Sequence, residues 1–238
     1  MLYLLRLQII IAALLLFCLN GYGQREQHRA HHDDLSYYFG MSVAYNYSYL
    51  HATKHVTFIN NDSIASVNPS GSGGVALGLH ATAKLTERLQ VRFHPQLIIG
   101  GSKLFTYVLK YPQPGEKTVE EKKLPSTIVS LPIQFKFNSD RIHNFRVYMM
   151  GGLKYDIDLA SNSNARNAEN LVKLKQSDFG VDVGIGFNIF MAFVTVSPEI
   201  KFSTGLTNIH ARDPKLKYSN VLDKLQSRMI TLSLILED

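Results

Sequence analysis

The chain has 238 residues, a formal net charge of +6 and a single cysteine, Cys18. One cysteine excludes the small exported folds that disulfides hold together, and the mild, scattered positive charge gives no support to nucleic-acid binding. Mean hydropathy is −0.03, close to neutral. This excludes a membrane protein built from helices, because such proteins contain long apolar runs and the chain has none after residue 23.

The first 23 residues have the pattern of a secretory signal peptide. A positively charged start that ends at Arg6 precedes an apolar stretch over 9–19, and small residues stand three and one positions before a cut after Gly23. The apolar stretch is shorter than the roughly 20 residues that a spanning helix needs. We therefore expect cleavage after Gly23, which also removes Cys18, with an uncleaved anchor as the alternative.

Residues 24–34 are polar and rich in histidine, and we interpret them as a flexible periplasmic lead. Their possible metal ligands are His28, His31, His32, Asp33 and Asp34. A metal site needs an outer shell of hydrogen bonds that orients its ligands, and a short unanchored segment supplies none. We therefore predict no metal and no other cofactor, and the alternative of a metal-binding lead stays open.

From residue 35 to residue 238 the chain is one domain with eight segments in which apolar residues alternate with small or polar ones. The segments are 35–50, 74–85, 89–111, 125–138, 144–159, 177–190, 193–206 and 226–237. In the first segment the apolar positions are Leu35, Tyr37, Phe39, Met41, Val43, Tyr45, Tyr47 and Tyr49. Strict alternation predicts a strand with one apolar and one polar face, and this run exceeds the about 5–6 residues of an ordinary strand.

Long and short connections alternate between these segments. The long ones are expected at 51–73, 112–124, 160–176 and 207–225, and the short turns at 86–88, 139–143 and 191–192. Long external loops and tight periplasmic turns are typical of an outer-membrane barrel. We therefore predict an all-β fold, an eight-stranded antiparallel up-and-down transmembrane β-barrel in the outer membrane of a Gram-negative cell, in contact with membrane lipid.

The structural alternative is a soluble eight-stranded barrel of the lipocalin type, which would turn its apolar face inward. The polar positions of this chain hold many glycine, serine and alanine residues, whereas a soluble surface would be richer in long charged side chains. This composition favours the lipid-facing barrel, with the polar positions inside.

Charged residues of both signs share the inward phase. An eight-stranded barrel is just wide enough for side chains to fill it, so buried charges inside need partners. We predict a network of ion pairs in the lumen, with the acids on adjacent strands meeting the basic groups. Its members are Arg92, Arg146, Lys154, Asp182, Glu199 and Lys201. The functional alternative is a gated or selective pore.

Two inward histidines, His80 and His94, raise the question of an enzyme. Nucleophilic catalysis needs a serine and an orienting acid beside one of them, and nothing in the spacing places inward serines such as Ser42 there. We therefore predict no catalytic residue and no enzyme, and identify no small-molecule substrate. A lipid-modifying enzyme is the remote alternative.

The last long loop, 207–225, has the most regular pattern of the four. Tyr218, Val221, Leu222 and Leu225 have helical spacing, which predicts a short helix with one apolar stripe. The stripe either docks a partner or packs on the barrel rim. The candidate partner-contacting residues are Asn208, Arg212, Asp213, Tyr218 and Leu222.

Four sequence runs resemble the PorT family of Bacteroidetes outer-membrane barrels. They are Leu131-Pro132-Ile133-Gln134-Phe135-Lys136-Phe137, Gly151-Gly152-Leu153-Lys154-Tyr155, the run from Asp178 to Gly186, and Ser197-Pro198-Glu199-Ile200-Lys201-Phe202-Ser203. The resemblance extends from about residue 35 to the end of the chain, and the Arg212-Asp213-Pro214 loop is close to PorT itself.

The resemblance implies a non-enzymatic accessory of the type IX secretion and gliding-motility system, with protein partners in the secretion machinery. No catalytic residues can be carried over from the family, because it has no motif of that kind to match here. The alternative function is a small general-purpose outer-membrane barrel for adhesion or envelope integrity.

Overall fold

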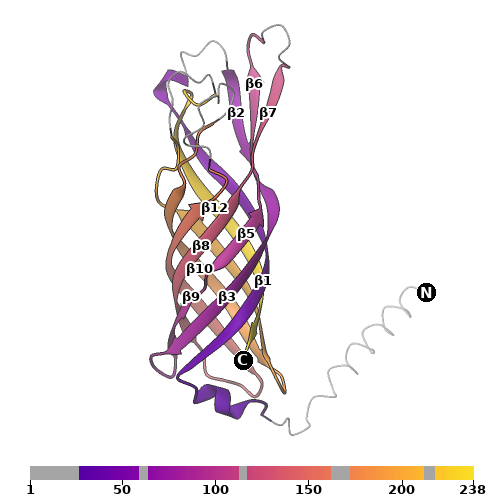
Figure 1. Ribbon diagram of the computed structural model, residues 1–238, viewed down its shortest axis with the longest axis vertical. Helices are drawn as coiled ribbons and strands as arrows, with labels where there is room; N and C mark the ends of the chain where they lie inside the picture. The colour runs from indigo at the N-terminus through magenta and orange to yellow at the C-terminus, as the bar shows by residue number, and fades with distance from the viewer. Residues whose placement is uncertain (1–26, 59–63, 113–116, 162–171, 212–217) are drawn as a thin grey trace, which may run out of the picture.

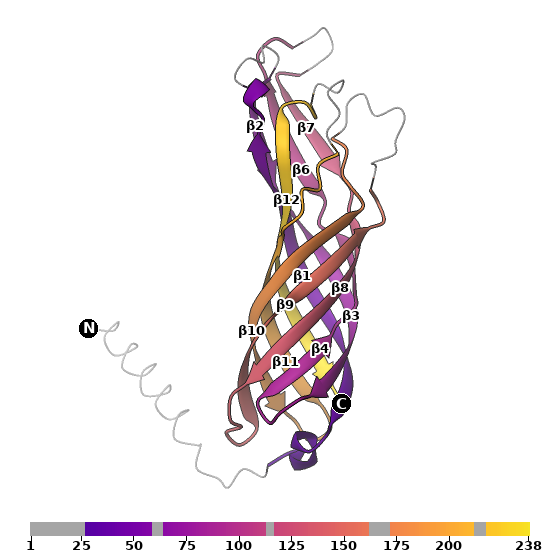
Figure 2. The same cartoon turned by 90° about the vertical axis from the view of Figure 1, so that its left-hand side faces the viewer.

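The computed structural model describes residues 27–58, 64–112, 117–161, 172–211 and 218–238. It contains long antiparallel strands that wrap around one axis, with a smaller sheet at one end (Figures 1 and 2). The elements are η2 (Ala30–Asp33), β1 (Tyr37–Lys54), η3 (Val56–Phe58), β2 (Ile64–Ser70), β3 (Ser72–Lys84), β4 (Leu89–Phe93), β5 (Gln96–Gly100), β6 (Lys103–Leu109), β7 (Val119–Leu124), β8 (Thr127–Asn138), β9 (Phe145–Asp158), β10 (Ser177–Phe190), β11 (Thr195–Gly205) and β12 (Leu222–Glu237).

The large sheet closes on itself. Its strand order is β1-β12-β11-β10-β9-β8-β4-β3-β5, with β1 also pairing β3 and β8 also pairing β5. Strands β4 and β5 are the two halves of one strand, because both lie between β3 and β8 and keep one register, from Ala81↔Phe93 to Gly78↔Gln96. The nine strands therefore form an eight-stranded barrel, which confirms the predicted fold. Pro95, which has no N–H to donate, separates the two halves.

The apolar positions of the barrel strands point outward. Val43 is 56% exposed and its neighbour Ala44 only 4%, and the same alternation runs along β1 and β12. Only a bilayer makes a continuous apolar outer surface favourable, while the ladder satisfies every backbone group of the closed sheet. None of the helices in the described residues is long and apolar enough to cross a membrane.

The third predicted strand, 89–111, is wrong in its last part. Gly100 and Gly101 have φ angles of 85° and 68°, which only glycine adopts without strain, and there the chain turns out of the barrel. The residues that follow form β6, the centre of a second sheet with order β2-β6-β7. The expected loops 51–73 and 112–124 therefore contain the strands β2 and β7.

The second sheet and the connections around it make a folded head on one end of the barrel (Figure 1). The head has its own apolar core, which includes Leu50 of β1, Phe105 and Tyr107 of β6, and Leu124 of β7. Its other buried members are Ile64, Val67, Leu109, Val172, Leu174, Ile209, Tyr218, Val221, Leu222 and Leu225. Both barrel and connections contribute, so the head packs directly on the barrel.

The short helix predicted within 207–225 is wrong for the residues that the structure describes. A turn at 218–221 leads straight into β12, which begins at Leu222. Tyr218, Leu222 and Leu225 are all buried in the head core. Apolar residues that are buried on different sides of a turn and of the strand that follows it can have the same spacing as the apolar face of a helix. This coincidence explains the error.

The predicted flexible lead is also wrong for residues 27–34. These residues cross the end of the barrel opposite the head, which we call the mouth, and include the 3₁₀ turn η2 (Figure 2). Side-chain hydrogen bonds to the barrel hold them there, and His32 is buried. The predicted signal peptide and its cleavage after Gly23 lie outside the described residues.

Candidate functional site

The lumen contains a buried ion pair between Arg92 of β4 and Glu199 of β11. The Arg92 guanidinium donates to the Glu199 carboxylate over 2.6 Å, and both side chains are fully buried. The Tyr148 hydroxyl donates to the same carboxylate oxygen over 3.0 Å, and Arg92 Nε donates to Gln134 Oε1 over 3.1 Å. Side chains from β4, β8, β9 and β11 thus meet at the centre of the barrel, although Arg92 Nη1 and Glu199 Oε1 have no hydrogen-bond partner among the described residues.

A second pair joins Lys201 to Asp182 on the neighbouring strand, with Nζ and Oδ2 3.7 Å apart. Gln134 Nε2 donates to the same carboxylate oxygen over 3.2 Å, which links this pair to the one at Arg92. Two other basic residues of the predicted network have different partners. Lys154 is bonded to Asp156 two residues along its own strand, and Arg146 pairs with Asp33 at the mouth, outside the lumen.

Glu237, the last residue of β12, is a network member that the sequence analysis did not include. Its carboxylate is fully buried, with Oε1 3.6 Å from Lys136 Nζ and 3.5 Å from His80 Nε2. A terminal charged pair such as Glu237-Asp238 ordinarily suggests a solvated chain end. The alternation along the strand could have identified Glu237 as an inward residue, because it continues the series of inward positions that includes Ser233 and Ile235.

The lumen is therefore packed with paired side chains. Arg92, Gln134 and Lys136 have no exposed surface, and an apolar group on β1, β3, β5, β8 and β12 lines the wall toward the head. The members of that group are Ala44, Ala76, Ile98, Ile128 and Met229. Paired charges and an apolar wall fill a narrow barrel and rigidify it.

One serine–histidine pair occurs in the lumen, which bears on the enzyme alternative. Ser42 Oγ lies 2.8 Å from His94 Nε2, and the amide nitrogen of Gln96 lies 3.1 Å from His94 Nδ1. Within the described residues, these are the side chains that hydrogen-bond to His94, and neither is a carboxylate that would orient the ring as a general base. Both Ser42 and His94 are also buried, away from any substrate in the bilayer.

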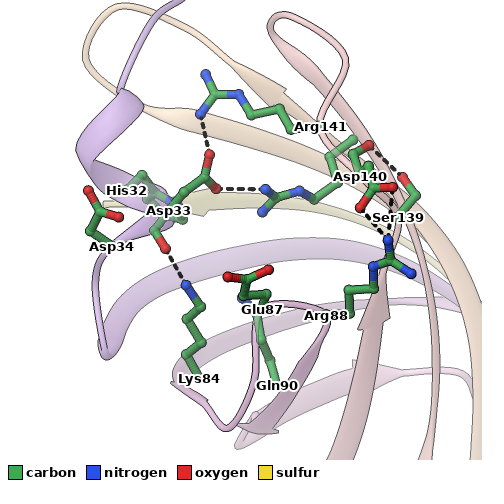
Figure 3. A pocket seen from close by; sticks show the side chains of 11 residues that line it. His32, Asp33, Asp34, Lys84, Glu87, Arg88, Gln90, Ser139, Asp140 and Arg141 are labelled. Carbon is green, nitrogen blue, oxygen red and sulfur yellow. Dashed lines mark hydrogen bonds and ion pairs between the residues drawn. The ribbon is translucent and has the colours of Figure 1, made fainter.

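The mouth is the second polar site. A cavity of about 220 Å³ lies beside η2. Charged side chains of both signs surround it (Figure 3). They include Asp33, Lys84, Glu87, Arg88, Asp140, Arg141 and Arg146. Asp33 is at the centre of the contacts, because its carboxylate accepts from Arg141 over 3.0 Å and from Arg146 over 2.7 Å.

The histidines of the N-terminal segment do not converge on a metal site. His32 is buried against the Tyr38 and Phe190 rings, whereas His31 is exposed. In the part of the chain that the structure describes, no group of three or more histidine, cysteine or acidic side chains is arranged to hold a metal ion.

The head contains the described members of the candidate partner-contacting loop. Asn208 Oδ1 accepts from the backbone N–H groups of Leu225 and His210 over 3.0 and 3.1 Å, so it fixes the loop. Tyr218 and Leu222 are buried, and the Tyr218 ring packs edge-on against Tyr107 at 4.8 Å between centroids. Tyr218 and Leu222 therefore build the head core and do not form its outer surface, whereas Asn208 is half-buried. Arg212 and Asp213 lie outside the described residues.

Burial also affects the head electrostatically. It raises the pKa of the Tyr107 hydroxyl above its ordinary value, and the neighbouring Tyr218 acts in the same direction. The Tyr107 hydroxyl donates to the Tyr218 backbone oxygen over 3.4 Å, so it stays neutral and hydrogen-bonded within the core.

A family model described as "Outer membrane protein beta-barrel domain" matches residues 24–211. Among solved structures, OprG from Pseudomonas aeruginosa is 14% identical with a TM-score of 0.41, and the match covers 84% of this chain and 96% of OprG. Neisserial surface protein A is 9% identical, with a TM-score of 0.39 and coverage of 83% and 95%. Ail of Yersinia pestis is 8% identical, with a TM-score of 0.38 and coverage of 86% and 100%. No curated protein matches.

Proposed function

The chain belongs to the outer membrane protein beta-barrel domain family, and on that premise we propose a closed, non-enzymatic barrel that acts through contacts made by its head. The packed lumen carries this proposal. A conducting pore needs a continuous polar path, whereas the Arg92–Glu199 pair crosses the centre with both side chains fully buried. A role in adhesion or envelope integrity needs no such path and fits this architecture.

The head is the surface through which such a barrel would act. The long connections all lie at the head end, so the head is extracellular and the mouth periplasmic. The head core of fourteen buried residues fixes its shape. The side chains that a partner can reach are the exposed ones, such as Val56 and Tyr111, which are 78% and 75% exposed. A rigid support with exposed apolar and aromatic groups is typical of a contact surface.

The closed lumen is tested by conductance. We expect the purified protein in planar lipid bilayers to give no steady channel, because paired side chains fill the barrel. Large, stable, reproducible conductance steps would contradict the proposal and favour the pore. An Arg92→Ala/Tyr148→Ala variant is the positive control, since removing two large buried side chains from the centre opens the cross-section.

A second candidate function is accessory contact within the type IX secretion machinery, and it rests on the resemblance to PorT. The four runs that carry the resemblance fall on β8, β9, β10 and β11, which are consecutive neighbours in the barrel. They supply Lys136, Lys154, Asp182, Glu199 and Lys201 to the lumen. These four runs therefore lie in the barrel wall, and the head is where secretion partners would bind.

Deletion of the protein separates the two candidates. If it serves type IX secretion, proteomics of the culture medium will show loss of the secreted cargo, and re-expression of the intact chain will restore it. A Val56→Asp/Tyr111→Asp variant changes exposed head residues and leaves the head core intact, so it is expected to insert normally and fail to restore secretion. Normal secretion by the deletion strain would reject the type IX role and leave the general-purpose barrel.

A further inference from the structure

We propose that residues 27–34 form an acid-released latch on the periplasmic mouth of the barrel. This mouth latch is docked at neutral pH and leaves the mouth when His32 gains a proton. The inference concerns the mouth and does not depend on what the head binds. It rests on three features of the described residues: the anchors of the latch, the burial of His32, and the positive charges around that ring.

Asp33 is the main anchor of the mouth latch (Figure 3). Its carboxylate accepts from Arg141 in the β8–β9 turn and from Arg146 of β9, over 3.0 and 2.7 Å. Its backbone oxygen accepts from Lys84 at the end of β3. One residue of the latch is thus bound to two parts of the barrel that are separated along the ring by β4 and β8.

Arg29 ties the latch to the opposite part of the ring. Its guanidinium donates to the backbone oxygen of Glu237 on β12 over 2.8 Å and to Thr195 Oγ1 on β11 over 3.2 Å. The backbone N–H of His28 donates to Asn144 Oδ1 over 2.8 Å. These contacts span the mouth, so the segment behaves as a strap across it.

His32 is the part of the latch that enters the mouth. It is only 6% exposed, and its ring lies 4.7 Å from the Tyr38 ring and 5.7 Å from the Phe190 ring between centroids. The Arg141 guanidinium lies over the same Phe190 ring, 3.7 Å from its centroid, and Arg146 lies 5.6 Å from it. The imidazole therefore occupies an aromatic pocket that already holds two cations.

Burial disfavours a proton on His32 most strongly, whereas the charges that face the ring act in both directions. Arg29 on its own segment and Lys136 on β8 disfavour the charged ring, while Glu237 on β12 and Asp33 favour it. Burial is the largest effect, and together they lower the pKa of His32 from 6.5 to about 4. Glu237 gives limited relief, because its carboxylate also faces Lys136 and His80 in the lumen.

The sign of the pH effect follows from linkage. The pKa of His32 is lower in the docked latch than in the released latch. The docked state is therefore fully favoured above pH 6.5, and its population decreases as the pH falls. Between pH 6.5 and pH 4, His32 is protonated in the released latch but neutral in the docked latch, because its pKa in the docked latch is about 4. The ratio of docked to released latch therefore falls by up to about tenfold per pH unit across this window, or about 300-fold in all.

Site-directed spin labelling measures this release. The chain's single cysteine lies in the predicted signal peptide. The mature chain carrying Ala30→Cys therefore takes one label, at an exposed position of η2. In lipid vesicles we expect an immobile label at pH 7.5 and a growing mobile component between pH 6.5 and 4. Heat-modifiable gel mobility at each pH shows that the barrel itself stays folded.

His32→Phe and His31→Phe are the matched variants. His32→Phe keeps an aromatic ring in the pocket and removes the titration, so its label should stay immobile from pH 7.5 to 4.5. His31→Phe changes the exposed neighbouring histidine and should release like the parent. The Asp33→Asn variant weakens the main anchor, so its latch should be released at a higher pH than that of the parent. Release can therefore be observed in this variant even if the parent latch stays docked down to pH 4.

Three results would overturn the proposal. They are a label that is mobile at pH 7.5, a label that stays immobile to pH 4 in both the parent and Asp33→Asn, and a His32→Phe latch that releases with the parent's pH profile.

Discussion

Replacing Arg92 by methionine is expected to destabilise the barrel by about 3–5 kcal/mol. The substitution leaves the Glu199 carboxylate in the lumen without the guanidinium that lies 2.6 Å away. The Tyr148 hydroxyl would still donate to this carboxylate, and one neutral donor does not offset a buried charge. The chain has no tryptophan, so the folded fraction in urea is followed in vesicles by heat-modifiable gel mobility.

Two controls isolate the buried pair. Arg92→Met combined with Glu199→Gln removes both charges and should recover most of the lost stability, because neither charge is then buried alone. Arg88→Met breaks the ion pair with Asp140, in which the two charged atoms lie 3.0 Å apart and both side chains are exposed, so it should cost less than about 1 kcal/mol. Equal losses for Arg92→Met and Arg88→Met would mean that the lumen is open to water.

The barrel was predictable because one physical constraint controls every strand. Lipid on one side and a packed polar lumen on the other force strict alternation, and residues such as Val43 and Ala44 show it directly in the sequence. Strands β2 and β7 were not predictable in this way. They pair outside the bilayer, where a sequence such as Val119-Glu-Glu-Lys-Lys-Leu124 carries no alternation of apolar residues and resembles a solvated loop.

The lumen network was predictable in membership but not in pairing. Phase places Arg92, Asp182, Glu199 and Lys201 inside the barrel. Which cation meets which acid depends on the stagger between strands that are not sequence neighbours, as for Arg92 of β4 and Glu199 of β11. The inward or outward position of a residue in its strand does not predict the partner of Arg146. Arg146 pairs with Asp33 because it lies at the mouth end of β9, and its inward position alone does not determine this.

The mouth latch has no sequence signature for a similar reason. Its residues are polar and lack periodicity, which is typical of a flexible lead. They are ordered by groups that come together only when the barrel closes, such as Arg141 in a turn and Thr195 on β11. The same argument applies to Glu237, which is buried because β12 closes against β1 and not because of its local sequence.

An arginine in place of Val183 is expected to destabilise the barrel by about 2–4 kcal/mol in lipid vesicles. Val183 lies midway along β10, is 57% exposed on the outer face, and has Phe202 and Gly151 as its partners across the two neighbouring strands. A guanidinium at that depth must leave water or drag water into the hydrocarbon. The measurement is the same urea titration used for Arg92.

Phe193→Arg is the matched control, since Phe193 is 92% exposed in the turn between β10 and β11, at the edge of the membrane. There the arginine reaches water, and the expected cost is about 0–1 kcal/mol. The difference between the two positions measures depth in a bilayer, because a soluble barrel would tolerate both substitutions on its exposed face with changes of about 0.5 kcal/mol or less. Equal tolerance of arginine at Val183 and Phe193 would therefore contradict a lipid-facing surface, and with it the physical reason for the alternation along every barrel strand.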